Sequence, residues 1–202
     1  MLRITDVVKH LIIINVIVYV VFVFLFPQYQ VYSILHMPWG TEQEFAPVQL
    51  VTHMFMHSPH SFTHLLFNMM GLYFLGPHIE QVFGKERFLI FYLACGFSAM
   101  GLHMLLSYVG FIGAVPVVGA SGAIMGIFIA FAILFPNTKL MLLFPPIPIK
   151  AKFLMGALIL FDLFSGVGGF STGIAHFAHL GGALCGFVLM VMWGYFDVKR
   201  FR

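Results

Sequence analysis

The stretch that decides the fold is GASGAIMGIFIAFAILFP, residues 119–136. It carries no charge, and its apolar run from Ser121 to Phe135 stops at Pro136, a residue that cannot continue a helix. At about 1.5 Å per residue such a helix measures roughly 22 Å, whereas the hydrocarbon core of a bilayer is about 30 Å thick. If the helix reaches the inner interface, its first residue lies below the outer surface of the membrane.

Ser121 stands at this submerged helix start. The preceding segment, 108–119, has no charged residue and is rich in Gly and Val. Irregular backbone at membrane depth is tolerated only where it is buried in protein or lines a wet cavity, so we expect a cavity open to the outside. The free N–H groups and positive dipole end of the helix would stabilise an oxyanion there. The alternative is that Ser121 only caps the helix within a small-residue packing motif.

The composition of the chain indicates an all-α, polytopic membrane protein. Of its 202 residues, 61% are hydrophobic and 8% are charged, against about 25% charged in a typical soluble domain. We expect residues 1–202 to form one membrane-embedded domain of six spans, with a short central fourth span. The apolar stretches that predict these spans are 7–26, 61–79, 88–108, 121–135, 152–165 and 175–195.

The basic residues predict the orientation. With six spans, all ten Lys and Arg residues fall on one side of the membrane, and the other side carries only Glu42 and Glu44. The positive-inside rule then places both termini in the cytoplasm. No further soluble domain is evident, so a bacterial inner membrane is the expected location. The net charge of +3, without a basic stripe, gives no reason to expect a nucleic-acid partner.

Polar residues recur at one depth in this topology. Ser121, His179, His64 and Asn68 all come to the outer third of the bilayer, where ionisable residues mark functional sites by default. A serine needs an adjacent base to become nucleophilic, and a neutral histidine suits that role. His64, Asn68 and the Ser121 backbone N–H would donate hydrogen bonds to a tetrahedral oxyanion.

Two neighbouring residues leave alternatives open. His176 lies three residues before His179 on a similar helix face and competes with it for the role of base. Asp162 is either a buried hydrogen-bond partner in helix packing or a residue at the outer water boundary. Apart from Asp162, no carboxylate lies near this depth, so a Ser–His dyad is favoured over a triad.

Glycines support the pairing of the fourth and sixth spans. Gly122 and Gly126 form a G-x-x-x-G directly after Ser121, and Gly182 and Gly186 form another after His179. Small residues four apart let helix backbones approach closely in membranes. The alternative is that these glycines serve only to pack the helices and indicate no catalytic role.

These motifs together resemble the rhomboid family of intramembrane serine proteases, over roughly residues 45–190. The family carries G-x-S-G at the start of the fourth helix, H-x-x-x-N on the second, A-H-x-x-G-x-x-x-G on the sixth, and a Gly–Glu–Gly pattern after the second. The matching residues are Gly119 to Gly122, His64 to Asn68, Ala178 to Gly186, and Gly76, Glu80 and Gly84.

The resemblance implies a six-helix rhomboid-like bundle and a protease. Ser121 would be the nucleophile and His179 the base, while His64, Asn68 and the loop backbone would form the oxyanion hole. Substrates would be membrane proteins whose transmembrane helices unwind easily, and no metal or organic cofactor would be used. Neither the cleavage site nor the oligomeric state follows from the motifs.

The chain departs from the family at two places. Many members have Trp-Arg in the first outer loop, where Val48 and Gln49 stand here, so we expect the anchoring of this loop to differ. Many also have an aromatic residue four positions after the serine, stacked on the catalytic histidine. Here it is Met125, which packs on a ring through its sulfur but less rigidly.

Two other classes of function compete with the protease. One is a catalytically inactive rhomboid-like module that binds membrane proteins without cutting them, although both Ser121 and His179 are present. The other is a histidine-rich metal carrier or metalloprotease, but no H-E-x-x-H occurs and no carboxylate joins the cluster. The histidines at metal-ligand spacing are His53, His57, His60 and His64.

Overall fold

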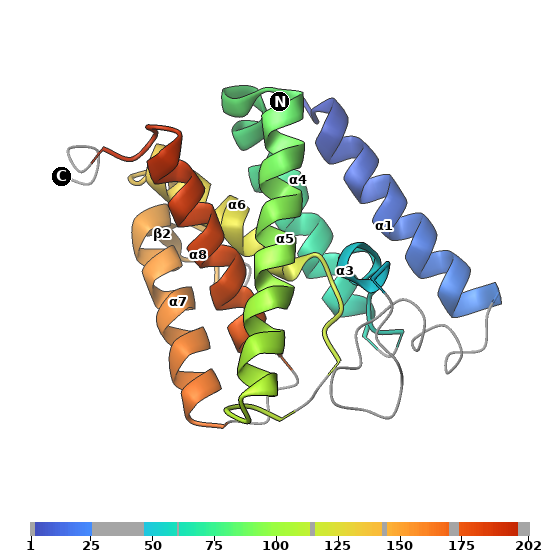
Figure 1. Ribbon diagram of the computed structural model, residues 1–202. Helices are drawn as coiled ribbons and strands as arrows, with labels where there is room; N and C mark the ends of the chain where they lie inside the picture. Colours follow the sequence, from blue (N-terminus) through green and yellow to red (C-terminus); the bar gives the residue numbers. More distant parts are fainter. Residues whose placement is uncertain are drawn as a thin grey trace.

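The computed structural model describes the following residues of the chain (Figure 1): 3–25, 47–59, 61–113, 116–142, 145–169 and 174–197. Within them the chain forms helices joined by loops and one short hairpin. The elements are α1 (Asp6–Leu25), α3 (Gln49–Thr52), α4 (Phe62–Phe83), α5 (Lys85–Tyr108), α6 (Ser121–Leu134), β1 (Lys139–Met141), β2 (Pro148–Lys150), α7 (Ala151–Val167) and α8 (His176–Met192).

The helix α6 occupies the centre of the bundle. It begins at Ser121, where the sequence predicted a helix start, and it packs against α4, α5, α7 and α8. Residues 122–127 are all buried, so the first two turns of α6 are surrounded by protein. After α6 the chain turns through an antiparallel hairpin in which Leu140 of β1 faces Ile149 of β2.

Each predicted apolar stretch coincides with a helix, and the largest difference in boundaries is at α4. The sequence placed the end of this span at residue 79, whereas α4 continues through Pro77 to Phe83. Glu80 is only 3% exposed, because its carboxylate binds the first turn of α1. Glu80 therefore lies inside the bundle, where it satisfies backbone groups at the start of α1.

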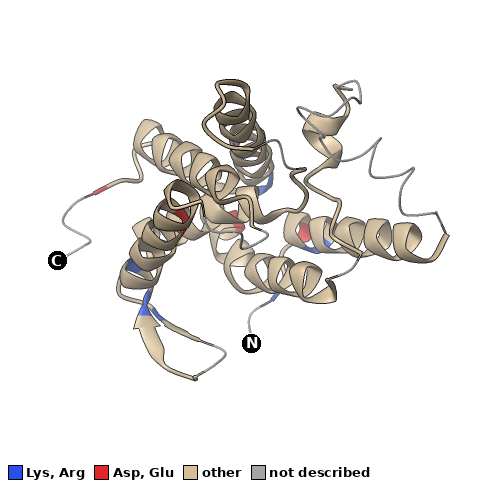
Figure 2. Cartoon of the chain, turned by 90° about the horizontal axis from the view of Figure 1, so that it is seen from below, with Lys and Arg blue, Asp and Glu red and all other residues tan. Residues whose placement is uncertain are grey.

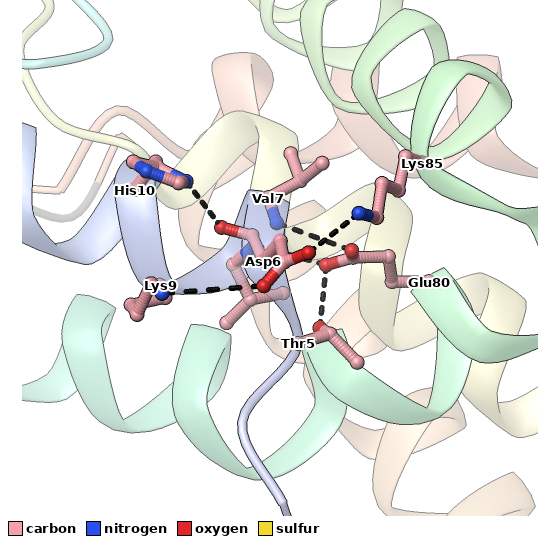
Figure 3. Close-up of polar contacts among 8 residues, drawn as sticks. Thr5, Asp6, Val7, Lys9, His10, Glu80 and Lys85 are labelled. Carbon is pink, nitrogen blue, oxygen red and sulfur yellow. Dashed lines mark hydrogen bonds and ion pairs between the residues drawn. The ribbon is translucent and has the colours of Figure 1, made fainter.

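Figure 3 shows this contact between the start of α1 and the end of α4. The Glu80 carboxylate accepts hydrogen bonds from the backbone N–H groups of Val7 (3.1 Å) and Val8 (2.9 Å), and from the hydroxyl of Thr5. The first N–H groups of a helix have no partner within the helix, so Glu80 supplies one. Beside it, the Lys85 ammonium forms an ion pair with Asp6.

Basic residues of the described part gather at one end of the bundle. The starts of α1, α5 and α7 and the end of α8 lie at the upper end in Figure 1. Most of the helical ribbon in Figure 2 carries neither basic nor acidic residues. The described Lys and Arg residues are Arg3, Lys9, Lys85, Arg87, Lys139, Lys150 and Lys152. Glu42 and Glu44, which the sequence predicts on the outer side, and the C-terminal basic residues lie outside the described ranges.

Among the described helices, α1 and α5 are long and apolar enough to cross a membrane by length and composition. The helices α6 and α8 are apolar but shorter, with 14 and 17 residues. The helix α4 has 22 residues but does not meet the combined test of length and composition. Length and composition alone therefore indicate two spans within these ranges, not six.

Candidate active site

Ser121 and His179 are in hydrogen-bond contact. The Ser121 Oγ lies 2.9 Å from the His179 Nε2, although 58 residues separate them in the sequence. Ser121 is the first residue of α6, and His179 lies in the first turn of α8. The two side chains therefore meet because α6 and α8 start at the same end of the bundle.

Glycines allow the two helices to approach this closely. A Cβ on Gly182 would lie 1.9 Å from the carbonyl oxygen of Gly122, and a Cβ on Gly186 would lie 2.8 Å from the Cα of Gly126. Real Cβ atoms do not occur at such distances, so the backbones of α6 and α8 are in direct contact at both levels. The first of these contacts is immediately after Ser121.

The loop before Ser121 is attached to the segment that precedes α4. Gly119 has φ +112°, a conformation that L-residues with a side chain rarely adopt. Its N–H donates a 2.9 Å hydrogen bond to the carbonyl oxygen of His53. Gly119 therefore gives the chain the turn that brings Ser121 to the start of α6.

His64 and Asn68 lie beside this loop. A Cβ on Gly119 would lie 2.8 Å from the His64 Nε2 and 3.7 Å from the Asn68 Nδ2, so both side chains border the loop. Asn68 donates one N–H to the carbonyl oxygen of His64 at 2.8 Å, and its amide has a second N–H to offer. The structure thus brings the expected oxyanion donors next to the backbone that leads into Ser121.

A carboxylate completes this cluster. Asp162 of α7 is 3% exposed, and both of its carboxylate oxygens lie 3.2 Å from the His179 Nδ1. The sequence favoured a serine–histidine pair without a carboxylate, and on this point the structure differs. The helices α7 and α8 pack together, and position 162 of one faces position 179 of the other. An acidic residue within an otherwise apolar span was the available signal.

Of the two competing histidines, His179 is the one that contacts Ser121. The His176 Nδ1 instead lies 2.6 Å from the Asp162 Oδ1. His176 is 4% exposed, whereas the side chain of His179 is 19% exposed. The ring that contacts the serine is therefore also the one that solvent or a substrate reaches more easily.

His53 and His57 support the site from the segment before α4. The His53 Nδ1 lies 3.0 Å from the carbonyl oxygen of Gln49, and burial lowers the pKa of His53 to about 4. Burial, reinforced by the charge of His64, lowers the pKa of His57 to about 3. The rings of His57 and His64 lie 5.2 Å apart, centroid to centroid. Both His53 and His57 are therefore neutral at neutral pH, and His57 packs against an expected oxyanion donor.

The described residues contain no group of three or more His, Cys, Asp or Glu side chains that could hold a metal ion. His60, one of the four histidines at metal-ligand spacing, lies outside these ranges. His53 is engaged with backbone, and His64 borders Gly119.

The two departures from the family pattern lie near the site. Gln49, at the position nearest the missing Trp-Arg, is fully buried, and its carbonyl oxygen accepts the contact from His53. Val48 beside it is 53% exposed. Met125, one turn after Ser121, is 7% exposed and belongs to the central apolar core.

Comparison with known proteins identifies relatives. The Rhomboid domain model matches residues 44–196. Rhomboid protease AarA of Providencia stuartii is 31% identical over 162 residues, which cover 69% of this chain and 53% of the relative. Presenilin-associated rhomboid-like protein A, mitochondrial, of Danio rerio is 34% identical over 147 residues, which cover 72% of this chain and 37% of the relative.

RHOMBOID-like protein 1 of Arabidopsis thaliana is 31% identical over 146 residues, which cover 68% of this chain and 34% of the relative. The chain thus spans between a third and a little over half of the length of these relatives. The matched region contains α3 to α8 and all the residues of the cluster described above. The match extends over well more than half of the sequence, and the chain therefore belongs to the rhomboid family of integral membrane proteins.

Proposed function

We propose that the protein is an intramembrane serine endopeptidase in which Ser121 is the nucleophile and His179 the general base. The observation that carries this proposal is the 2.9 Å contact between the Ser121 Oγ and the His179 Nε2 at the start of α6. A nucleophile and a base within hydrogen-bond reach are the geometric signature of covalent catalysis. Membership of the rhomboid family supports the same assignment.

The reaction follows from the positions of these atoms. The His179 Nε2 takes the Ser121 hydroxyl proton as the Oγ forms a bond to the carbonyl carbon of the scissile peptide. The protonated ring then delivers this proton to the leaving nitrogen, and the C–N bond breaks. A water molecule, deprotonated by His179, attacks the acyl-enzyme, releases the new carboxyl group and restores the serine hydroxyl.

The tetrahedral intermediate carries a negative oxygen that needs hydrogen-bond donors. His64 and Asn68 border Gly119, and the backbone N–H of Ser121 lies at the free amino end of α6. Donors held in place before the reaction stabilise the developing charge without reorganisation. We assign the oxyanion hole to these three groups.

The membrane arrangement is part of the proposal. The helices α1, α4, α5, α6, α7 and α8 are the spans, and the end of the bundle that carries the Lys and Arg residues faces the cytoplasm, with both termini. Ser121 then enters from the outer side, below the lipid surface. Substrates are transmembrane segments of other membrane proteins, and a bacterial inner membrane is the proposed location. The reaction needs no metal or organic cofactor.

Activity-based labelling tests this proposal. Purified wild type, Ser121→Ala and His179→Ala are incubated with a fluorophosphonate probe, which forms a covalent bond with an activated serine. Wild type is expected to label, Ser121→Ala to remain unlabelled, and His179→Ala to label far more slowly. Equal labelling of wild type and Ser121→Ala would contradict the assignment. A membrane client that binds for hours without being cut would indicate a binding module instead.

A further inference from the structure

Asp162 is a buried acid in an apolar helix. It lies in the apolar sequence LILFDLF of α7 and is 3% exposed. A charged side chain within a membrane span is costly, so such residues pair with partners and mark functional pathways. Asp162 pairs with both histidines of the first turn of α8: its Oδ1 lies 2.6 Å from the His176 Nδ1 and 3.2 Å from the His179 Nδ1.

The chemistry of these contacts determines the positions of the protons. A carboxylate only accepts hydrogen bonds, so the Nδ1 atoms of His176 and His179 both donate to Asp162. A neutral imidazole carries one N–H, and with the proton on Nδ1 its Nε2 is an acceptor. The His179 Nε2 then accepts from the Ser121 hydroxyl, 2.9 Å away. This tautomer is the one that a general base for Ser121 requires.

We propose that Asp162 is the positioning residue of this site: it holds His179 in the Nδ1–H tautomer and orients its Nε2 toward Ser121. This inference rests on the function proposed above. It extends the serine–histidine pair to a hydrogen-bonded chain of three residues, Ser121, His179 and Asp162. The carboxylate also stabilises the imidazolium that forms when His179 takes the serine proton, without itself becoming protonated.

His176 restrains Asp162 from the other side. The Asp162 Oδ1 accepts from His176, and the ring of His176 meets that of Phe161 edge-on, 5.5 Å from centroid to centroid. The carboxylate is therefore held between the buried His176 and the partly buried His179 that contacts Ser121. His176, which competed with His179 for the role of base, instead fixes the group that orients the base.

Steady-state kinetics on a transmembrane substrate provide the first test. Asp162→Asn keeps the size of the side chain but can present an N–H to His179, which favours the wrong tautomer. We expect its kcat to fall between about a hundredfold and ten-thousandfold while KM changes by less than about threefold. The matched control is Ser165→Ala, which removes a buried hydroxyl one turn further along α7. We expect this variant to keep the wild-type kcat.

A second variant separates positioning from helix packing. His176→Phe removes one partner of Asp162 but leaves its contact with His179, so we expect a smaller loss of kcat than in Asp162→Asn. If the two variants lost the same activity and the same thermal stability, Asp162 would serve only to join α7 to α8, and the inference would be overturned. An Asp162→Asn enzyme with wild-type kcat would also overturn it.

Nitrogen NMR provides a readout that does not depend on turnover. In ¹⁵N-histidine-labelled wild type, with the signals assigned by their loss in His179→Ala, the His179 ring should carry its proton on Nδ1. An Nε2–H ring in the wild type would overturn the inference even if Asp162→Asn failed to fold. Labelling that survives in Ser121→Ala would instead contradict the proposed protease. The NMR result therefore tests the role of Asp162, whereas the labelling result tests the proposed protease activity.

Discussion

The carbonyl oxygen of Gly122 occupies the space that a Cβ on Gly182 would need, with only 1.9 Å between the two positions. The helices α6 and α8 therefore touch through their backbones one residue after Ser121 and three residues after His179. No side chain stands between them at this level. The 2.9 Å contact between the serine and the histidine depends on this close approach.

Gly182→Ala is expected to separate α6 from α8. The added methyl group meets backbone rather than a flexible side chain, so the helices have to move apart, and the Ser121–His179 contact lengthens. We expect a lower melting temperature and at least about a hundredfold loss of labelling rate, because small misplacements at a reacting centre cost this much. Melting and probe-labelling curves of the purified variant measure both.

Gly156→Ala is the matched control for this substitution. Gly156 lies within α7, and a Cβ there would meet no atom within 4 Å. Alanine favours a helix over glycine by up to about 1 kcal/mol, so this variant should be as stable as wild type or more stable. If Gly182→Ala and Gly156→Ala had the same melting temperature and labelling rate, the close contact at Gly182 would not be needed to hold Ser121 beside His179.

Glu80→Ala is expected to loosen the start of α1. The N–H groups of Val7 and Val8 and the hydroxyl of Thr5 lose their acceptor, and an unsatisfied buried donor such as the Val8 N–H costs about 1–3 kcal/mol. A melting curve should show a marked loss of stability. Glu86→Ala, which removes an exposed acid in the first turn of α5, should melt like wild type. Equal stability of the two variants would show that Glu80 contributes nothing to anchoring α1.

His53 is expected to make the folded state sensitive to acid. Burial lowers its pKa to about 4, below the value of about 6.5 in an unfolded chain. Between these two values the unfolded chain binds more protons, so the free energy of unfolding falls as the pH drops from about 6.5 toward 4 and is constant above. At about 1.36 kcal/mol per unit, His53 contributes a loss of up to about 2 kcal/mol at pH 5.

Melting curves between pH 8 and pH 5 measure this effect. In His53→Gln, which cannot become protonated, the decrease in melting temperature over the range should be smaller than in wild type. Identical slopes for the two proteins would assign the acid sensitivity to other groups. The difference between the melting temperatures of wild type and His53→Gln at pH 8 measures the effect of the substitution apart from protonation.

His64→Ala and Asn68→Ala test the oxyanion hole. Removal of one donor costs roughly a hundredfold to a thousandfold in kcat where that donor stabilises the developing charge. We expect this loss with little change in KM for either variant, measured on a cleavable transmembrane substrate. Phe74→Leu is a control on the same helix, since Phe74 is 54% exposed. A normal kcat in both His64→Ala and Asn68→Ala would exclude these two side chains from the oxyanion hole.

The motifs predicted much of this arrangement because they depend on spacing along single helices. The start of α6 at Ser121 follows from the length of the apolar run before Pro136, and the proximity of His64 to Asn68 follows from one helical turn. Glycine pairs that follow Ser121 and His179 were enough to suggest that α6 and α8 are neighbours.

Contacts between side chains of different helices depend on how the helices are rotated relative to one another. Spacing along the sequence does not determine this rotation. Asp162 stands among apolar residues, and the sequence cannot show whether it faces α8, lipid or water. Its contacts with His176 and His179 arise from the packing of α7 on α8. Likewise, the partners of Glu80 lie at the start of α1, 72 residues or more away in the chain, so spacing along α4 does not identify them.

The contact between α6 and α8 has a mechanical consequence. With backbone against backbone at two levels, neither helix has room to turn about its axis without a clash. Under the proposed function, we therefore expect a substrate helix to reach Ser121 by movement of α1, which packs on α4 and α5 and carries no residue of the site, while the central pair stays rigid. Substitutions on the exposed face of α1 should alter which substrates enter and how fast, and leave the alignment of serine and imidazole untouched.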